Sequence, residues 1–270
     1  MSLKIIVLAK QVPDTRNVGP DAMTPEGTVN RSALPAIFNP EDLNALEQAL
    51  RLKDQFPGTT VHVLTMGPGR AAEVIREAMY RGADGGYLLT DRAFAGADTL
   101  ATSYALATAI KHVCPDADLI IGGRQAIDGD TAQVGVQIAI HLGIPVTTYV
   151  EKLVEVNDTS ITVQRQYEDR YQTVRMQYPC LITAIGDLNQ PRYMSVGGCF
   201  DAYRKEIRIM TYADIADVVD ESNIGLKGSP TFVAKSETKE AKGAGTVLKD
   251  LTADEAVSAI VEKLASMHII

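Results

Sequence analysis

The alternation of two patterns along the first 142 residues constrains the fold more than any other feature of the chain. Short, mostly apolar runs are typical of buried strands, and between them lie stretches with apolar residues at helical spacing. No hairpin signal joins one strand to the next. Four strand–loop–helix units in a row indicate a parallel, doubly wound sheet with right-handed crossovers. The expected strands are residues 3–10, 59–66, 86–90 and 118–121, and the expected helices are residues 40–55, 71–81, 98–113 and 131–142.

The period of the pattern changes after residue 145. Residues 146–156, 160–167 and 171–178 alternate polar and apolar side chains, which is typical of antiparallel strands with one exposed face. Residues 180–185 are again mostly apolar, and we expect them to rejoin the main sheet. The predicted fold class is α/β: a doubly wound, mostly parallel sheet with an added antiparallel meander and an extended C-terminal arm.

The residues after Asn189 have a different character. Residues 189–199 show little regular structure, and residues 227–245 are polar and rich in Gly, Ser, Thr and Lys. Such a polar stretch buries too little apolar surface to offset the entropy of ordering. A last helix is expected over residues 253–267, with a stripe formed by Val257, Ile260, Val261 and Leu264. The residues alone allow this helix to fold back on its own domain or to reach a second chain.

Charge and composition exclude several classes of function. A net charge of −8 argues against nucleic acid as the main partner, because phosphate backbones need a basic surface. No apolar run approaches the roughly 18 residues that a membrane helix needs, and residues 3–9 are too short for a signal peptide. The 3 cysteines and 4 histidines are scattered without metal-ligand spacing, which favours free thiols in a reducing compartment. We therefore expect a cytoplasmic protein with no membrane insertion, no metal site and no catalytic histidine.

The stretch 122–135 is the strongest candidate for a binding site. It follows a buried strand and leads into a helix, and in an open α/β sheet ligands bind at such junctions, beyond the carboxyl ends of the strands. Small residues at Gly129, Thr131 and Ala132 allow a phosphate to approach the free N–H groups of the first helical turn. Asp128 or Asp130 is expected to cap the helix or to accept hydrogen bonds from a ribose or a base. A plain capped turn with no ligand is the alternative for this stretch taken alone.

A second helix start lies at residues 39–42. Asn39 stands at the N-cap position, Pro40 at the first helical position, and Glu41 and Asp42 in the first turn. A loop of about thirty residues precedes it, and loops of that length in compact domains are usually functional or disordered.

Several stretches together resemble the small (beta) subunit of electron-transfer flavoproteins. The run Arg-Gln-Ala-Ile-Asp-Gly-Asp-Thr at residues 124–131 is long and specific, unlike a lone glycine fingerprint. The resemblance covers nearly the whole chain in order, and its other stretches are residues 10–15, 39–47, 82–84, 123–135 and 191–193.

The resemblance implies a heterodimer. The large (alpha) subunit carries an electron-shuttling FAD, and the small subunit has a doubly wound core of the type that binds an adenine nucleotide. In the housekeeping branch of the family this nucleotide is AMP, with a structural role only. In the anaerobic, bifurcating branch it is a complete second FAD, and NADH docks beside it.

Residues 12–15 and 128–131 look more like the bifurcating branch, with Gly129 and Thr131 leaving room for a pyrophosphate. We therefore expect FAD, with AMP as the alternative, and NADH as the electron donor.

The bifurcating branch also implies that electrons leave this flavin by two routes. One leads to the large-subunit FAD and on to an acyl-CoA-type dehydrogenase, and the other leads to ferredoxin or flavodoxin. No side chain of this chain is expected to act as an acid, a base or a nucleophile, because the flavin carries the chemistry. The chain is then redox-active only as part of a flavoprotein complex.

The resemblance places the nucleotide contacts at strand ends and helix starts. Ala9 packs on the adenosine, Met66 forms a soft wall for the base, and residues 39–42 present a second helix N-terminus. The complete expected set is Ala9, Asn39, Pro40, Glu41, Asp42, Met66, Gly123, Arg124, Gln125, Ala126, Ile127, Asp128, Gly129, Asp130, Thr131, Ala132, Gln133 and Val134.

Residues 193–199 match the loop by which the family recognises its partner dehydrogenase, and Tyr193 and Val196 are the expected contacts. Val196 stands where the family commonly has leucine, an exposed apolar side chain that can enter a partner's pocket. The two glycines that follow it, and the fewer basic residues after them, depart from the family pattern. The expected division is a nucleotide-binding domain (1–190), the recognition loop (191–200) and a C-terminal arm and helix that pack on the partner subunit (201–270).

An alternative from another class is a stand-alone nucleotide-binding or ATP-cleaving protein on the same type of sheet. It needs a phosphate-gripping glycine loop with a basic side chain after an early strand. Gly67, Pro68, Gly69 and Arg70 form a weak candidate for that loop. A scaffold with a vestigial nucleotide differs from the flavoprotein only in having no redox role.

Overall fold

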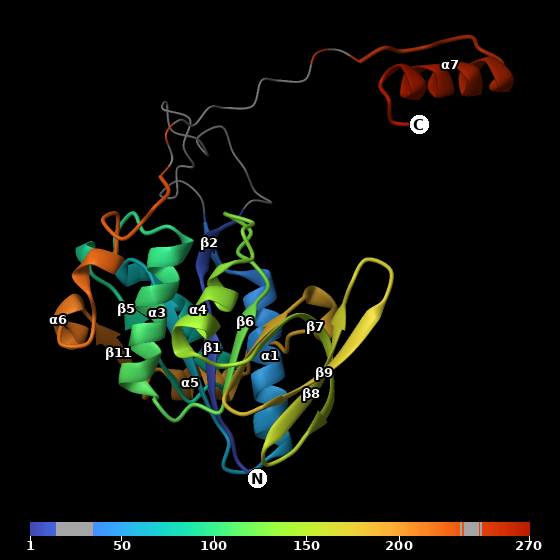
Figure 1. The fold of residues 1–270 in the computed structure, drawn as a ribbon. Helices are drawn as coiled ribbons and strands as arrows, with labels where there is room; N and C mark the ends of the chain where they lie inside the picture. The colour runs from blue at the N-terminus through green and yellow to red at the C-terminus, as the bar shows by residue number, and fades with distance from the viewer. Residues whose placement is uncertain (15–34, 233, 235–242, 244) are drawn as a thin grey trace.

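The sheet has nine strands in the order β11-β5-β4-β1-β6-β10-β7-β8-β9, in a computed structural model that describes residues 1–14, 35–232, 234, 243 and 245–270 (Figure 1). Its first strand, β1, lies between β4 and β6. The strands are β1 (Lys4–Leu8), β4 (Thr60–Met66), β5 (Gly85–Leu89), β6 (Leu119–Gly123), β7 (Val146–Val156), β8 (Ser160–Gln166), β9 (Tyr171–Gln177), β10 (Cys180–Ala184) and β11 (Ile207–Met210).

Every pair from β11 to β7 is parallel, and β8 and β9 add antiparallel neighbours at one edge. The predicted doubly wound sheet with an antiparallel meander is thereby confirmed. β10 rejoins the sheet between β6 and β7, as its apolar composition predicts. β7 belongs to both parts, because it is parallel to β10 and antiparallel to β8.

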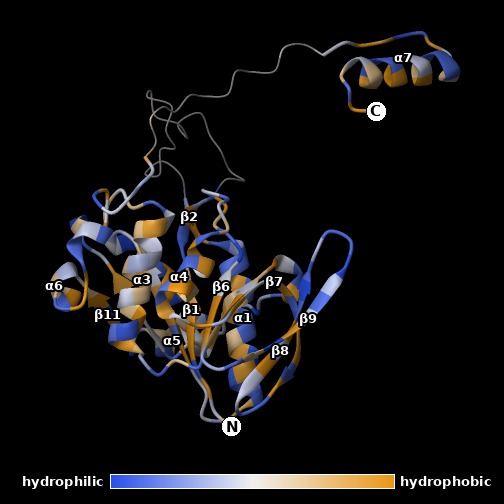
Figure 2. Cartoon of the chain, viewed as in Figure 1, coloured by the Kyte–Doolittle hydropathy of each residue, from blue (hydrophilic) through white to orange (hydrophobic). Residues whose placement is uncertain are grey.

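Helices cover both faces of the sheet and divide the core in two. One core cluster lies between the sheet and α1 and α2, and the other lies between the sheet and α3, α4 and α6. Figure 2 shows the hydrophobic colour gathered on the central strands and on the helix sides that meet them. The helices are α1 (Pro40–Gln55), α2 (Ala72–Arg81), α3 (Thr99–Val113), α4 (Val134–Leu142), α5 (Val196–Ala202), α6 (Tyr212–Ile215) and α7 (Ala253–Ser266).

Local signals account for most helix ends. The Asp98 side chain accepts hydrogen bonds from the N–H groups of Leu100 and Ala101 and so caps α3. Gly82 and Gly143 follow α2 and α4 with positive φ angles of 126° and 69°, conformations that glycine adopts without strain. These ends lie within a residue or two of the predicted ones.

Several short elements are absent from the sequence-based prediction. Short strands β2 (Gln11–Pro13) and β3 (Ala36–Phe38) pair with each other at the ends of the long loop. The stretch predicted to be irregular contains α5. β11 extends the sheet next to β5, although it lies in the segment assigned to the C-terminal arm. The first part of that segment is therefore built into the sheet.

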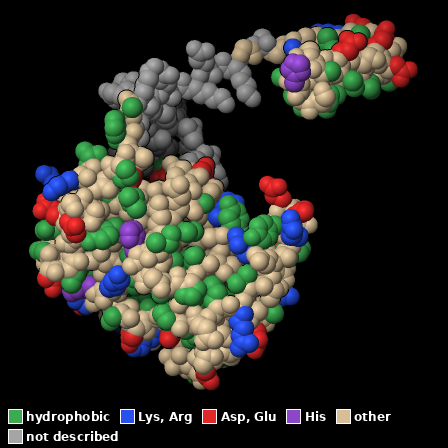
Figure 3. Space-filling model, in the orientation of Figure 1, with side chains coloured by type: hydrophobic (Ala, Val, Ile, Leu, Met, Phe, Trp, Pro, Cys, Tyr) green, Lys and Arg blue, Asp and Glu red, His purple; other side chains and the backbone are tan. Residues whose placement is uncertain are grey.

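The last helix, α7, is amphipathic and has no buried residue. Thr252 and Glu255 form a reciprocal capping box at its start, which stabilises a helix without tertiary support. Figure 1 draws α7 away from the sheet, and Figure 3 shows hydrophobic side chains along its lower edge and acidic ones along its upper edge. None of the helices among the described residues has the length and apolar character needed to cross a bilayer.

Candidate functional site

A cavity of about 740 Å³ lies at the carboxyl edge of the sheet. The ends of β1, β4, β5 and β6 and the loops that follow them form its walls. The chain leaves β1 toward β4 on one side and reaches β6 on the other, so the cavity lies at the point where the strand order reverses. Its volume is within the range of small-molecule and cofactor sites.

The first turn of α1 holds the loop that follows β6. The Asn39 side chain donates to the carbonyl of Gln125 at 2.9 Å and accepts from the N–H of Ile127 at 3.1 Å. Glu41 accepts from the N–H of Gln125 at 3.0 Å and forms an ion pair with Arg124 at 2.9 Å. These side chains therefore act on the backbone of the loop and fix the shape of the cavity wall.

Asp42 joins the ends of two neighbouring strands. One carboxylate oxygen accepts from the N–H of Lys10 at 2.8 Å and the other from the N–H of Gly123 at 3.0 Å. Burial raises the pKa of Asp42 to about 7, although both hydrogen bonds oppose this shift. A buried carboxyl group that titrates near neutral pH therefore lies in the cavity wall.

The predicted capping role of Asp128 and Asp130 is wrong. The helix begins at Val134 and its N-cap is Gln133, so both aspartates precede the capping position. Asp130 and Ala132 have positive φ angles of 49° and 52°, so a helix cannot run through residues 130–132. Asp130 instead accepts from the Gln125 side chain at 2.8 Å.

Asp128 forms an ion pair with Lys10 at 2.6 Å, and its side chain is 5% exposed. The negative charge that makes this aspartate unusual beside a phosphate is thereby compensated within the protein. Lys10 also lines the cavity. It is a positive charge at the site that the sequence-based set does not include.

The loop from β5 to α3 is the largest part of the cavity wall that the sequence analysis missed. Two acidic residues of this loop accept hydrogen bonds from backbone N–H groups of the protein. Asp91 accepts from the N–H groups of Ala93 and Tyr212, and Asp98 caps α3. The missed wall comprises Leu89, Thr90, Asp91, Arg92, Phe94, Ala95, Gly96, Ala97, Asp98, Thr99, Thr102 and Leu106. The signal for it was present, because β5 is the third strand–loop–helix unit and ends at the same edge of the sheet.

Arg124 has an unusual environment on the opposite wall. Its guanidinium lies 5.6 Å from the centre of the Tyr149 ring. Tyr149 has a φ angle of 58°, at an irregularity in the pairing of β7 with β10. The Nε atom of Arg124 is buried and has no hydrogen-bond partner among the described residues. The site thus contains an unsatisfied donor on a charged side chain, which fits an acceptor supplied by a ligand.

The structure brings most of the predicted cofactor-binding residues together. Of that set, the cavity wall contains Ala9, Asp42, Met66, Gly123, Arg124, Gln125, Ala126, Gly129, Asp130, Thr131, Ala132, Gln133 and Val134. Asn39, Pro40, Glu41, Ile127 and Asp128 are not on the wall. Nucleotide binding by any of these residues stays a prediction.

The predicted partner contacts lie outside the cavity. Tyr193 precedes α5 and is 93% exposed, and Val196 is the first residue of α5 and is 78% exposed.

Comparison with known proteins decides the family. The electron transfer flavoprotein domain model matches residues 26–215. A caffeyl-CoA reductase-Etf complex subunit, CarD, of Acetobacterium woodii is 51% identical over 99% of this chain and 100% of its own length.

The chain belongs to the electron transfer flavoprotein family.

Within the electron transfer flavoprotein family, the similarity is to small subunits. The electron transfer flavoprotein subunit beta of Clostridium acetobutylicum is 52% identical over 99% of this chain and 100% of its own length. The acryloyl-CoA reductase electron transfer subunit gamma of Anaerotignum propionicum is 44% identical over the same shares of the two chains. The resemblance drawn from residues 124–131 and the other stretches is confirmed.

Proposed function

We propose that this chain is the small subunit of a heterodimeric, bifurcating electron transfer flavoprotein of the cytoplasm, and that its cavity binds FAD and accepts electrons from NADH. The main support is the cavity at the reversal point of a doubly wound sheet, whose wall includes most of residues 123–134. The names of two similar proteins, which belong to caffeyl-CoA and acryloyl-CoA reductase systems, favour an acyl-CoA-type partner.

The residues of the cavity fit a dinucleotide. Apart from its chain neighbours, no described residue has a heavy atom within 4 Å of the position that a Cβ would take at Gly129, so a diphosphate can approach the backbone there. The first N–H groups of α4 have no partner inside the helix and favour an anion. Lys10 and Arg124 bring cationic side chains to the wall, each beside a carboxylate of the protein, and the Nε–H of Arg124, which has no partner among the described residues, is a further donor. Ala9 and Met66 lie in the same wall and are the proposed contacts of the adenosine.

A bound FAD supplies the exchange between two-electron and one-electron chemistry, which no side chain here provides. The chain's own part is to bind, to orient and to exclude water. Apolar side chains line the inner wall of the cavity and keep water from its base, and they are Leu8, Leu64, Leu89, Phe94 and Leu106.

We further propose three kinds of partner. The large subunit binds the amphipathic helix α7. An acyl-CoA-type dehydrogenase binds the exposed side chains of Tyr193 and Val196. Ferredoxin or flavodoxin takes the remaining electrons.

Counting flavins in the purified complex tests the proposal. The chain is produced together with its large subunit, and flavin is measured by absorbance and after acid extraction. One FAD in each subunit is expected, together with NADH-driven reduction of both acceptors at once. One flavin and one AMP per heterodimer would contradict the bifurcating function and leave the family unchanged. A monomeric, colourless chain that turns over ATP would contradict the subunit role as well.

The affinity for the nucleotide is expected to fall as the pH rises from about 6 to 8, because of Asp42. In the protein without ligand, the carboxyl group of Asp42 has a pKa of about 7. The negative charge of a bound diphosphate raises this pKa further. Binding then takes up a proton, so it is strongest below the pKa of the free protein. Calorimetric titration with FAD in two buffers of different ionisation enthalpy measures this uptake.

The variant Asp42→Asn removes the titrating group, and its affinity is expected to vary less with pH. Glu41→Gln, one residue away, keeps the titrating group and therefore the pH dependence, but its midpoint is expected to move to lower pH because the Glu41 charge helps to raise the pKa of Asp42. The same slope in Asp42→Asn as in the wild type would assign the proton to another group. Asp42 is expected to affect the stability of the ligand-free protein in the same direction. Its contribution to the free energy of unfolding is complete below its unfolded pKa of 3.8 and is lost as the pH rises through about 7.

A further inference from the structure

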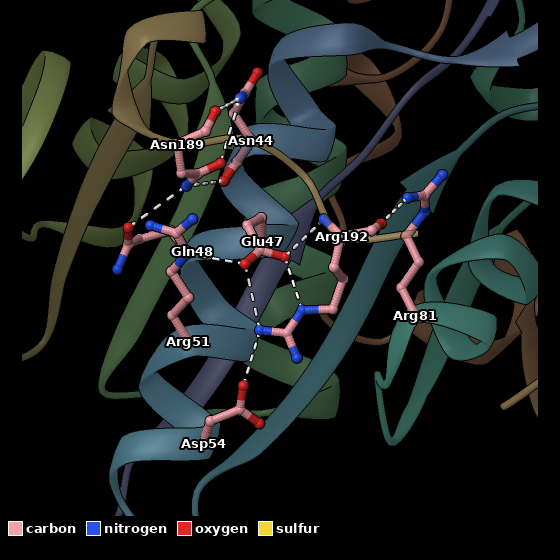
Figure 4. Close-up of polar contacts among 8 residues, drawn as sticks. All are labelled: Asn44, Glu47, Gln48, Arg51, Asp54, Arg81, Asn189 and Arg192. Atoms are coloured by element: carbon pink, nitrogen blue, oxygen red, sulfur yellow. Dashed lines mark hydrogen bonds and ion pairs between the residues drawn. The ribbon is translucent and has the colours of Figure 1, made fainter. Parts of the chain in front are cut away.

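The carboxylate of Glu47 is buried on α1, where it binds the chain just before segment 193–203, most of whose residues are exposed. Its Oε2 atom accepts from the backbone N–H of Arg192 at 3.1 Å and from the Nε–H of the same residue at 2.8 Å. Its Oε1 atom accepts from Nη2 of Arg192 at 3.3 Å and from Nε of Arg51 at 2.9 Å. Glu47 thus holds both the backbone and the guanidinium of Arg192 (Figure 4). Bidentate, charge-assisted hydrogen bonds of this kind are strong and directional.

Further contacts tie the same stretch to two helices. Asn189 is buried, and its side chain donates to the carbonyl of Asn44 on α1 at 3.0 Å. The Asn44 side chain donates in return to the carbonyl of Asn189 at 2.7 Å. On the other side, Arg81 of α2 donates to the carbonyl of Arg192 (Figure 4). Asn189 is therefore fixed to α1, and Arg192 is fixed to both α1 and α2.

The charge of Glu47 depends on Arg192. Burial by itself raises the pKa of the Glu47 carboxyl, but hydrogen bonds from Arg192 and Arg51 outweigh burial and hold the pKa below its ordinary value. The carboxyl group is therefore ionised at neutral pH. If Arg192 moved away, a buried charge would lose its main partner, which is strongly unfavourable. The pair thus resists any displacement of residue 192.

The backbone after Arg192 is held against α2. The N–H of Ser195 donates to the carbonyl of Tyr80 at 3.2 Å, and the Ser195 hydroxyl caps α5 through the N–H of Gly198. A Cβ at Gly198 would lie 2.4 Å from the same Tyr80 carbonyl oxygen. The backbone of α5 therefore packs on α2 with no room for a side chain at position 198. Arg76 of α2 donates to the carbonyl of Ala202 at the far end of α5.

Side chains of this fixed backbone are exposed and apolar. Tyr193 and Val196, the predicted partner contacts, are joined by Phe200 at 71% and Tyr203 at 74% exposure. Exposed apolar side chains gain affinity for a partner when their backbone is already in the bound conformation, because less entropy is lost on binding. The value of these side chains as contacts therefore depends on what holds residue 192.

We propose that Glu47 is the positioning residue of the partner-contact segment 193–203, acting through Arg192 to present Tyr193, Val196 and Phe200 as one preformed surface. This inference rests on the proposed function, which supplies the electron-accepting dehydrogenase as the occupant of that surface. The other end of α1 holds the cavity wall through Asn39, Glu41 and Asp42. One helix thus connects the proposed flavin site with the proposed partner surface.

The test compares Glu47→Gln with the wild type in the purified heterodimer. The amide cannot accept at both ends of the side chain, so one set of donors from Arg192 or Arg51 is left unpaired. The KM for the acyl-CoA-type dehydrogenase is expected to rise about tenfold, while kcat and the NADH-driven reduction of an artificial dye stay the same. Amide hydrogen exchange in residues 190–203 is expected to accelerate in the same variant.

Two further variants separate positioning from general stability. Asp54→Asn removes the other acidic partner of Arg192, which lies 2.8 Å from Nη2 but has a 63% exposed side chain, so little change is expected. Arg192→Lys keeps the positive charge but loses the planar guanidinium that donates to both carboxylate oxygens of Glu47. It is expected to behave like Glu47→Gln. Adding Glu47→Gln to Arg192→Lys is expected to have no further effect, because both changes remove one interaction.

Unchanged hydrogen exchange over residues 190–203 in Glu47→Gln would overturn the inference, whatever the flavin count shows. An equal loss of dye reduction and dehydrogenase turnover would also overturn it, because Glu47 would then support the whole subunit. Faster exchange over residues 190–203 with an unchanged KM would exclude this segment as the partner surface. The exchange measurement needs no partner, so failure of the proposed function remains distinguishable from failure of the positioning role.

Discussion

The variant Gly123→Ala is expected to lose nucleotide binding and to lower the free energy of unfolding by about 2–4 kcal/mol. A Cβ at this position would lie 2.4 Å from Oδ1 of Asp42 and 2.8 Å from its backbone nitrogen. The backbone nitrogen cannot move without shifting the first turn of α1, which also holds the loop 124–127, and Oδ1 can rotate away only by giving up its hydrogen bond from the N–H of residue 123. The cavity wall and the packing of α1 on the sheet are then disturbed together. Urea unfolding of the chain and the nucleotide content after purification measure the two effects.

Two other glycines provide matched controls. Within the described part of the chain, Gly69→Ala meets no atom within 4 Å and lies outside the cavity wall, so both stability and binding are expected to stay within about 0.5 kcal/mol of the wild type. Gly129→Ala also meets no atom of a described residue within 4 Å, but it stands where the diphosphate is proposed to approach. It is expected to weaken binding without loss of stability. Normal nucleotide content in Gly123→Ala would show that the site does not depend on this close approach.

Truncation of the chain after Leu248 is expected to weaken binding of the large subunit at least about 100-fold. The removed helix α7 has no buried residue, and its apolar stripe includes Val257, Ile260 and Val261, which are 59%, 58% and 47% exposed. Burial of such side chains is worth about 1.5–3 kcal/mol each, so three or four of them can account for the loss. Co-purification of the two subunits and a binding titration measure it.

Point variants distinguish the apolar stripe from a general effect of truncation. Ile260→Asp places a charge in the stripe and is expected to approach the effect of truncation, whereas Glu262→Gln, with an exposed side chain on the other side of α7, is expected to change little. Since α7 buries nothing in this chain, the truncated protein is expected to unfold at the same urea concentration as the full chain. Retained affinity for the large subunit in the truncated chain would exclude α7 as the subunit contact.

Local patterns account for what could be predicted of the fold. Helices α1 to α4 and α7 carry apolar stripes and end signals within their own residues, so their type and approximate bounds follow from the sequence. β11 is only four residues long and is a strand because it pairs with β5, more than a hundred residues earlier. α5 begins Val-Gly-Gly, a poor helical sequence, and is held by α2. Neither pairing leaves a signal in the local sequence.

The same limit applies to the candidate site. The rule that ligands bind at the carboxyl edge of the strands located the cavity, because it needs only the order of strands and helices. The use of Asn39 and Glu41 as supports for the loop 124–127 could not be predicted, since their partners lie more than 80 residues away. The start of α4 was predicted too early because the local sequence gives no sign of the positive φ angles at Asp130 and Ala132, and alanine in particular rarely adopts them.

The central place of β1 bears on how a ribosome delivers this chain. Its neighbours are β4, which ends at Met66, and β6, which ends at Gly123. A nascent chain that has already paired β1 with β4 still shows the other edge of β1 until Gly123 leaves the exit tunnel. Unpaired apolar edges of this kind attract other chains. We expect chaperones that cover extended apolar segments to bind this protein during that interval and to release it once β6 is in place.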